Sequence, residues 1–144
     1  MGKGRLRVAP IVAIALGALL VVGVLTFAGP CGVHEDGTVS PCFGTSHILA
    51  AMGAVAAIGA AVSLAMKNTS AQIALDVVVG LLGVAIACAP GNFLALCMMA
   101  TMRCHTIMRP FAIVMGIALL VAAIVDVVMV RRAQAGTSRR PVNR

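Results

Sequence analysis

Four long apolar segments alternate with short polar ones along the chain. The apolar segments span residues 8–28, 48–66, 73–90 and 111–130. Each is close to the ~20 residues that a helix needs to cross the hydrocarbon core of a bilayer. Backbone polar groups in lipid must be satisfied within each segment, so each segment should form an α-helix. The pattern therefore predicts an all-α polytopic membrane protein, a single membrane domain over residues 1–144 with four transmembrane helices in a bundle.

The overall composition supports a membrane location. Hydrophobic residues make up 61% of the chain and charged residues 10%, and the mean hydropathy is +1.08. A soluble domain of 144 residues could not hide that much apolar surface from water. The lipid bilayer is thus the first expected partner.

The basic residues predict how the chain is oriented. Nine of the eleven lie before the first segment, between the second and third, or after the fourth: Lys3, Arg5, Arg7, Lys67, Arg131, Arg132, Arg139, Arg140 and Arg144. Because basic residues stay in the cytoplasm, both termini and the basic tail 131–144 should be cytoplasmic, with outer loops 29–47 and 91–110 outside. We expect a multi-pass protein of a cell membrane. The charge does not predict a nucleic-acid partner, since no Tyr or Trp is present to stack on bases.

The two halves of the chain resemble each other. Each half has a helix, a break that contains proline, an outer loop with two cysteines, and a returning helix. Met52-Gly53 in the first half corresponds to Met115-Gly116 in the second. We therefore predict two helical hairpins in parallel repeat. Small residues at four-residue spacing predict close helix packing, at Ala9, Ala13 and Gly17 and at Gly53, Ala57, Ala61 and Ala65.

The outer loops contain four of the five cysteines. In an oxidising compartment, paired cysteines at short separation most often form disulfides, so we predict Cys31–Cys42 and Cys97–Cys104. Closing loops of about 8–12 residues would stabilise the fold by roughly 2–3 kcal/mol. Cys88, inside an apolar run, should remain unpaired. A bridge between the two loops stays open as an alternative, because both loops cap the same bundle.

Metal binding is an alternative for the same loops. The first loop offers ligands of the types that zinc prefers, and the second offers softer donors that suit Cu(I). These candidates are Cys31, His34, Cys42 and His47, and Cys97, Met102, Cys104 and His105. His47 and His105, near the outer ends of two spans, could also ligate haem as a bis-histidine pair.

Thiol–disulfide exchange is a further alternative. Four helices with two outer cysteine pairs resemble the quinone-linked membrane oxidoreductases that form disulfides. The chain lacks the C-x-x-C spacing that produces a reactive exchange pair, which weighs against this activity. Together with the lack of any nucleophile or acid–base constellation, this predicts that the protein is not an enzyme.

The carboxylates of Asp76 and Asp126 lie inside predicted spans. Carboxylates in a membrane are costly and are functional candidates by default. Each lies four or five residues from the cytoplasmic end of its span, so we expect these side chains to reach the interface or to meet Arg131 and Arg132.

The string Cys97…Met102-Arg103-Cys104-His105-Thr106, followed by an Ala/Gly-rich span, resembles an uncharacterised family of small prokaryotic membrane proteins with a domain of unknown function. Its hallmark is a cysteine, then Met-x-Cys-His, then a threonine that leads into a helix. In this chain the threonine directly follows His105, where the family usually has an intervening aromatic residue. The resemblance covers residues 73–130 best. Genes of this family are sometimes found beside permeases of the macrolide-exporter type of ABC transporter, which implies an accessory role in transport.

Taken with the residues themselves, the resemblance predicts a non-catalytic small integral membrane protein with disulfide-stapled outer loops. It would serve as an accessory subunit of a transporter assembly, with other membrane proteins as partners. Copper, zinc or haem delivery through the outer loops and thiol exchange remain the alternatives.

Overall fold

The computed structural model describes residues 8–28, 41–94 and 104–138, without the side chains of residues 41–42, 104 and 137–138. Within these ranges all regular elements are helical: α1 (Val8–Leu25), α2 (Pro41–Ala65), α3 (Thr69–Cys88), a π-helical turn η1 (Cys104–Met108) and α4 (Arg109–Ser138). All four α-helices are long and apolar enough to cross a membrane. The prediction of an all-α, four-helix membrane protein is confirmed.

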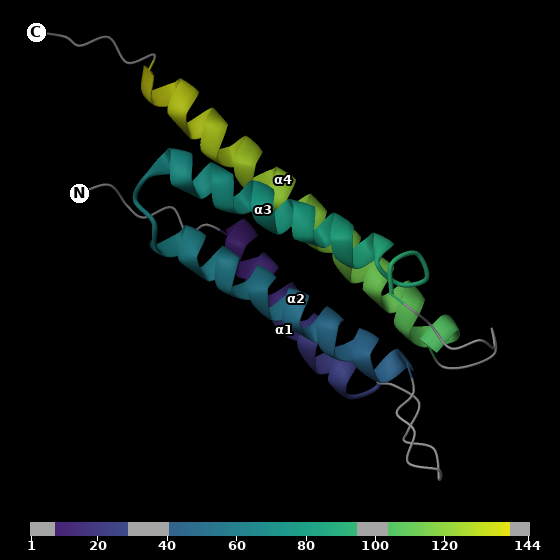
Figure 1. Cartoon of the computed structure of the whole chain (residues 1–144). Helices are drawn as coiled ribbons and strands as arrows, with labels where there is room; N and C mark the ends of the chain where they lie inside the picture. The colour runs from purple at the N-terminus through teal and green to yellow at the C-terminus, as the bar shows by residue number, and fades with distance from the viewer. Residues whose placement is uncertain (1–7, 29–40, 95–103, 139–144) are drawn as a thin grey trace, which may run out of the picture.

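The four helices form a ring of antiparallel neighbours. The most extensive contacts join α1 to α2 and α3 to α4, and smaller interfaces join α2 to α3 and α1 to α4. The first residues of α1 and the last residues of α4 lie at the same end of the bundle (Figure 1). The chain is therefore an up-down-up-down bundle of two hairpins, in which α1 and α3 run in the same direction.

Three helices extend beyond the spans predicted from hydropathy. Helix α2 begins at Pro41, seven residues before the predicted span, and α4 continues to Ser138, eight residues beyond it. Proline suits a first helical position because its φ angle is preset and its missing N–H would be unpaired there. The extension of α4 contains Arg131 and Arg132, good helix formers that stay exposed. Hydropathy identifies only the apolar part of a helix, which crosses the lipid. The helix itself can extend beyond that part, because its backbone hydrogen bonds do not require apolar side chains.

A three-residue turn joins α2 to α3. Asn68 caps α3, and its side-chain carbonyl accepts a hydrogen bond of 3.2 Å from the backbone N–H of Ser70. The Gln72 side-chain amide donates to the carbonyl of Met66, one of the carbonyls at the end of α2. These contacts close the turn from both sides and bring α3 back alongside α2.

The C-terminal end of α3 closes in a tight turn over residues 89–94. Gly91 has a φ of 87°, a conformation that side-chain-bearing residues rarely adopt. The side-chain amide of Asn92 donates to the carbonyl of Cys88 at 2.9 Å, and Leu94 N–H donates to the carbonyl of Ala89 at 3.0 Å. The Pro90-Gly91 break expected from the sequence is therefore a C-terminal cap of the helix.

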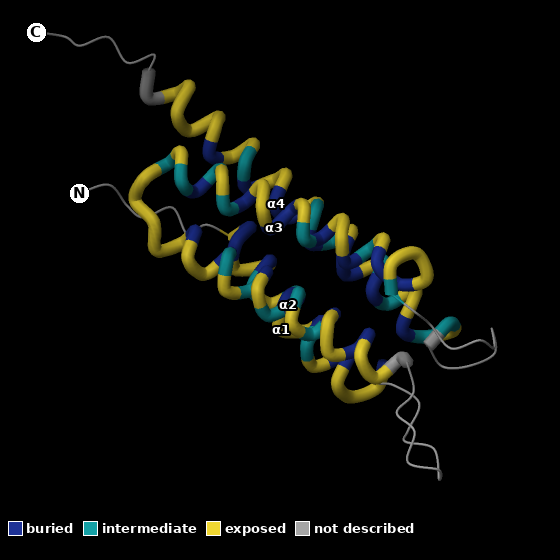
Figure 2. Tube along the Cα trace, viewed as in Figure 1, coloured by how far each residue is buried: buried dark blue, intermediate teal, exposed yellow. Residues whose placement is uncertain are grey.

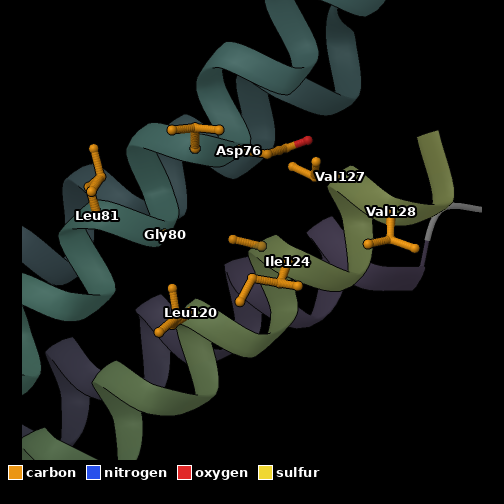
Figure 3. A pocket seen from close by; sticks show the side chains of 9 residues that line it. Asp76, Gly80, Leu81, Leu120, Ile124, Val127 and Val128 are labelled. Carbon is orange, nitrogen blue, oxygen red and sulfur yellow. The ribbon is translucent and has the colours of Figure 1, made fainter. Parts of the chain in front are cut away.

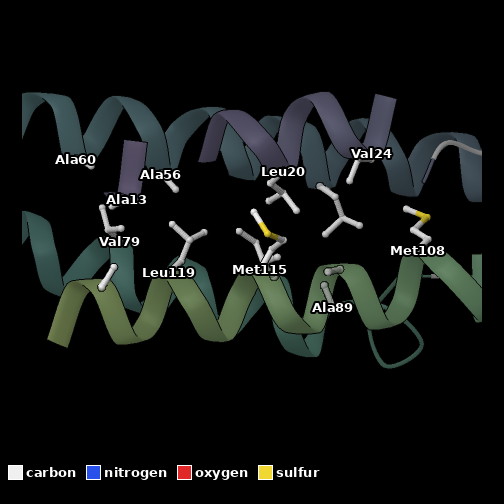
Figure 4. Close-up of a cluster of buried hydrophobic side chains, with 14 residues drawn as sticks. Ala13, Leu20, Val24, Ala56, Ala60, Val79, Ala89, Met108, Met115 and Leu119 are labelled. Carbon is white, nitrogen blue, oxygen red and sulfur yellow. The ribbon is translucent and has the colours of Figure 1, made fainter. Parts of the chain in front are cut away.

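Buried residues line the inner faces of the helices, and the outer faces of the helices are exposed (Figure 2). Leu20, Leu49, Ile86 and Leu119, one from each helix, are fully buried in the central cluster (Figure 4). The exposed outer faces are rich in Val, Ile and Leu. A helical bundle surrounded by lipid is apolar both in its core and on its outer faces.

The burial pattern repeats between the two hairpins. Six of the seven buried residues of α1 have a buried counterpart 66 positions later in or just after α3, as Leu20 has in Ile86. Buried residues of α2 have counterparts 63 positions later, as Leu49 has in Ala112. The hairpins are thus related by an approximate two-fold axis along the bundle. This equivalence supports the parallel repeat expected from the sequence.

Each hairpin contains one close backbone crossing at a pair of glycines. A Cβ atom placed on Gly17 would lie 2.8 Å from the carbonyl oxygen of Gly53, and one on Gly83 would lie 2.7 Å from that of Gly116. These two pairs are equivalent in the repeat. Contacts this short leave no room for a side chain, so glycine is required at both crossings.

The small-residue stripes are confirmed only in part. Ala9, Ala13 and Gly17 are all buried in α1, as predicted. In α2, Gly53 is buried, but Ala61 and Ala65 are exposed. The buried face of α2 runs instead through Leu49, Ala56, Ala60 and Ser63. Spacing alone did not identify this face, because small residues occur on every side of α2.

Two phenylalanines join α1 and α4 at the end of the bundle opposite the α2–α3 turn. The rings of Phe27 and Phe111 meet edge to face, with centroids 5.1 Å apart. Gly23 provides the space for this pair, because a Cβ there would lie 2.4 Å from the ring of Phe111. Phe93 is 83% exposed at the same end, in the turn after α3.

Candidate functional site

The two intramembrane aspartates are buried inside the bundle. Asp76 on α3 is 4% exposed and Asp126 on α4 is 3% exposed. The expectation that both side chains reach the interface is therefore wrong. Their helices place them on inward faces, Asp76 one turn after the buried Gln72 and Asp126 one turn after the buried Ala122. A carboxyl group on an inward helix face cannot extend to water past its neighbours.

Asp76 and Asp126 line one small cavity near the axis of the bundle. The cavity has a volume of about 10 Å³ and receives residues from all four helices: Ala9, Pro10, Ala13, Ala60, Asp76, Val79, Ala122, Ala123 and Asp126. Several of these residues are counterparts in the repeat, so the cavity lies close to the approximate two-fold axis. The two carboxylates are the only titratable side chains among these lining residues.

One carboxylate oxygen in this cavity lacks a partner. The Oδ2 atom of Asp126 is buried and makes no hydrogen bond within the described part of the chain. Arg131 and Arg132, which the sequence offered as partners, lie further along α4 and are exposed. An unpaired polar atom is costly to bury in apolar surroundings, which sets Asp126 apart from an ordinary core residue.

The first hairpin has no carboxyl group at the equivalent positions. Pro10 is the counterpart of Asp76, and Ser63 is the counterpart of Asp126. Ser63 is fully buried, and its hydroxyl donates to the carbonyl of Ala60 at 3.0 Å within its own helix. The repeat is therefore asymmetric at the cavity, with both acidic groups contributed by the second hairpin.

A larger apolar groove runs between α3 and α4 and begins at Asp76 (Figure 3). Its volume is about 260 Å³, and its lining residues besides Asp76 are Val77, Gly80, Leu81, Leu120, Ala123, Ile124, Val127 and Val128. Gly80 and Ala123 are the small residues of this lining. Asp76 and Ala123 border both the groove and the central cavity. The sequence reasoning singled out Asp76 but missed the groove, because Gly80 and Ala123 belong to no regular stripe.

The two described histidines lie at the end of the bundle opposite the α2–α3 turn. His47 is exposed on α2, where its Nδ1 lies 3.0 Å from the carbonyl oxygen of Phe43. Its ring lies against the Phe43 ring at a tilt of 42°, with centroids 4.4 Å apart. His105 is half-buried in η1. Within the described residues, no three His, Cys, Asp or Glu side chains are grouped closely enough to hold a metal ion.

Most of the predicted cysteine and metal sites lie outside the described residues. These are Cys31, His34, Cys97 and Met102, together with the side chains of Cys42 and Cys104. The two disulfides and the metal, haem and exchange hypotheses therefore stay predictions. Cys88, at the end of α3, is a free and exposed thiol, as expected.

Residues 13–129 match a protein family described as a domain of unknown function, DUF4418. The chain belongs to this family. The DUF4418 match covers both hairpins, and thus a longer part of the chain than the region that carries the sequence motif. The motif and the gene neighbourhood noted above stay predictions. No curated protein and no solved structure is detectably similar to this DUF4418 chain.

Proposed function

We propose that this protein is a non-catalytic accessory subunit of a membrane transporter assembly, and that the groove between α3 and α4 receives a transmembrane helix of the partner. The observation that carries the proposal is the groove itself, which is about 260 Å³ in volume and almost entirely apolar. It lies within the spans of both helices, so its occupant must be apolar as well.

The shape of the groove favours a helix. Helices in lipid associate through close van der Waals packing at small residues, because the lipid tails already satisfy apolar surface. Gly80 and Ala123 give such a surface, and the larger Leu81, Leu120 and Ile124 side chains stand beside them. A partner helix could pack closely over the small residues and be held in register by the larger ones.

The small residue Gly80, which lines the groove, has no small counterpart in the first hairpin. The counterpart of Gly80 in α1 is Ile14, a side chain that packs against the core. The two outer faces of the bundle therefore differ in shape even though their cores repeat. The small residue at this position of the second hairpin favours the second hairpin as the contact surface.

The class of partner comes from the family resemblance. Genes of this family are sometimes found beside permeases of the macrolide-exporter type of ABC transporter, which implies such a permease as the partner. The protein would stabilise or position the permease's transmembrane helices.

A photo-crosslinking residue at Leu81 tests this proposal against a matched control at Ile58. The two side chains are 64% and 63% exposed, but only Leu81 borders the groove. In cells that co-express the permease, we expect Leu81 to give a covalent adduct with the permease and Ile58 to give little. The substitution G80L, which fills the groove, should abolish the adduct.

Equal crosslinking from Leu81 and Ile58 would contradict the groove as the contact surface. Recovery of the protein only as a lone monomer, across several mild detergents and in the presence of the permease, would count against an accessory role altogether.

A further inference from the structure

We propose that Arg131 and Arg132 form a binding surface for anionic phospholipid headgroups, at the end of the bundle where α4 extends past its apolar segment. The inference goes beyond the accessory role proposed above and does not depend on it. It rests on where α4 places the two arginines, on their exposure and on the charges at that end of the bundle.

Helix α4 places the arginines at the level of lipid headgroups. The helix is continuous from Arg109 to Ser138, and between Arg109 and Arg131 it contains one charged residue, the buried Asp126. At 1.5 Å per residue, an α-helix covers about 33 Å between these two arginines. The hydrocarbon core of a bilayer is about 30 Å thick. When Arg109 stands at one surface of this core, Arg131 therefore stands at the other.

The arginines lie on the lipid-facing side of α4. Val130, which directly precedes them, is 4% exposed and faces the bundle. Val121, Val125 and Met129 form an exposed row at four-residue spacing, and none of them borders the groove between α3 and α4. Because residues three and four positions apart share a helix face, Arg132 continues this row. A lipid whose chain packs along the row thus meets a guanidinium group at its phosphate.

The exposed charge at this end of the bundle is positive. Lys67 is exposed in the α2–α3 turn, which lies at the same end (Figure 1). The acidic residues in the described part of the chain are Asp76 and Asp126, and both are buried. The sequence adds six basic residues and no acidic one in residues 1–7 and 139–144. Anionic lipids are attracted to basic residues that flank a membrane span.

The guanidinium group suits a lipid phosphate. Arginine stays charged and presents its N–H donors in a planar fork that matches two phosphate oxygens. Phosphatidylcholine has the same phosphate but also a cationic choline, whereas phosphatidylglycerol has a net negative charge. The surface should therefore distinguish the two lipids by their charge.

The composition of the chain makes a local measurement practical. The chain contains no Trp or Tyr, so M129W introduces a single tryptophan beside the two arginines. V114W is the matched reporter near the other end of α4, since Val114 is 63% exposed and Met129 is 56% exposed. Each variant is reconstituted in mixed vesicles of phosphatidylcholine and phosphatidylglycerol, in which one lipid carries brominated chains that quench tryptophan. The quenching gives the relative binding constant of the two lipids beside each reporter.

We expect phosphatidylglycerol to bind about fivefold more tightly than phosphatidylcholine beside the tryptophan of M129W. The preference in V114W should be smaller, because Arg109 is the one described arginine at that end. Adding R131Q/R132Q to M129W should remove most of the preference, and adding the control R109Q should leave it unchanged. Raising NaCl from about 0.1 M to about 1 M should weaken the preference, because the screening length falls from about 10 Å to about 3 Å.

Equal quenching by the two brominated lipids in M129W would overturn the proposal. A preference that R109Q lowers as much as R132Q does would overturn it as well, because it would reflect net charge alone. Inorganic phosphate should displace no more lipid than NaCl at the same ionic strength. A larger displacement would assign the arginines to a free anion and refute the lipid surface.

Native mass spectrometry of the chain without a tryptophan gives an independent measurement. After exposure to an equal mixture of the two lipids, the protein should retain more phosphatidylglycerol, and R131Q/R132Q should lose this difference. Equal retention of both lipids by the unsubstituted chain would refute the proposal, even if a tryptophan variant fails to insert into vesicles.

Discussion

Replacement of Gly116 by alanine should separate the two helices of the second hairpin. A Cβ atom at this position would lie 2.5 Å from the carbonyl oxygen of Gly83 and 2.7 Å from the backbone N of Ala87. Ordinary contacts of a Cβ begin at 3.4 Å, so the first contact is about 0.9 Å too short. Because both opposing atoms belong to the backbone of α3, no side-chain rotation can relieve the clash, and the helices must move apart.

The change in stability caused by G116A follows from two opposing effects. Overpacking of a tight interface typically costs about 1–3 kcal/mol. Alanine in place of glycine within a helix gains back up to about 1 kcal/mol. We therefore expect G116A to destabilise the bundle by roughly 1–2 kcal/mol. G136A is the matched control, because a Cβ there meets nothing within 4 Å and only the gain in helix propensity remains.

The other glycine crossings predict a graded series. G17A should be costly as well, because its Cβ would meet the Gly53 carbonyl at 2.8 Å. G53A should be milder, because its closest contact is the flexible end of Leu20 at 2.9 Å. The double variant G83A/G116A should cost less than the sum of its parts, since one separation of the helices relieves both clashes.

The assay measures unfolding in mixed detergent micelles as the SDS fraction is raised. Unfolding is monitored through the loss of the helical circular dichroism signal. We expect the midpoint of G116A to move to lower SDS than that of wild type, and the midpoint of G136A to stay or rise. If G116A and G136A unfold at the same SDS concentration, the close crossing of α3 and α4 is wrong.

The remaining predictions concern topology, pairing and the outer aromatic contact. In a C88S background, which removes the free native thiol, a membrane-impermeant maleimide should label a cysteine introduced at Asp36 from outside intact cells and one introduced at Gly136 only after lysis; labelling of residue 36 only from the cytoplasm would invert the topology. Non-reducing peptide mapping should find one disulfide within 29–47 and one within 91–110, with Cys88 free; a bridge between the two loops would refute the pairing. Replacing Phe111 by leucine removes the edge-to-face ring contact and should lower stability by roughly 0.5–1.5 kcal/mol in the same SDS assay, and an unchanged midpoint would contradict that contact.

The number and nature of the helices follow from the sequence because both depend on local properties. A run of about 20 apolar residues must form a helix in lipid, whatever surrounds it. The repeat is also visible locally, since Met52-Gly53 and Met115-Gly116 mark equivalent helix positions, and both glycines are buried. The helix ends beyond the spans were not predictable in this way. Helix α2 begins at Pro41, outside the apolar segment, so hydropathy did not indicate where this helix starts.

Which face of each helix turns inward was decided only by the tertiary structure. In α2 small residues occur on all sides, so spacing pointed to Ala61 and Ala65, while packing against α1 and α3 selected Ala60 and Ser63.

The same limit applies to the aspartates. Their distance from the membrane interface predicted exposed side chains, but the rotation of α3 and α4 about their axes buries both Asp76 and Asp126. Two residues fifty positions apart in the sequence share one cavity only because four helices meet there. Sequence distance and membrane depth contain no information about helix rotation, because rotation is decided by how all four surfaces fit together.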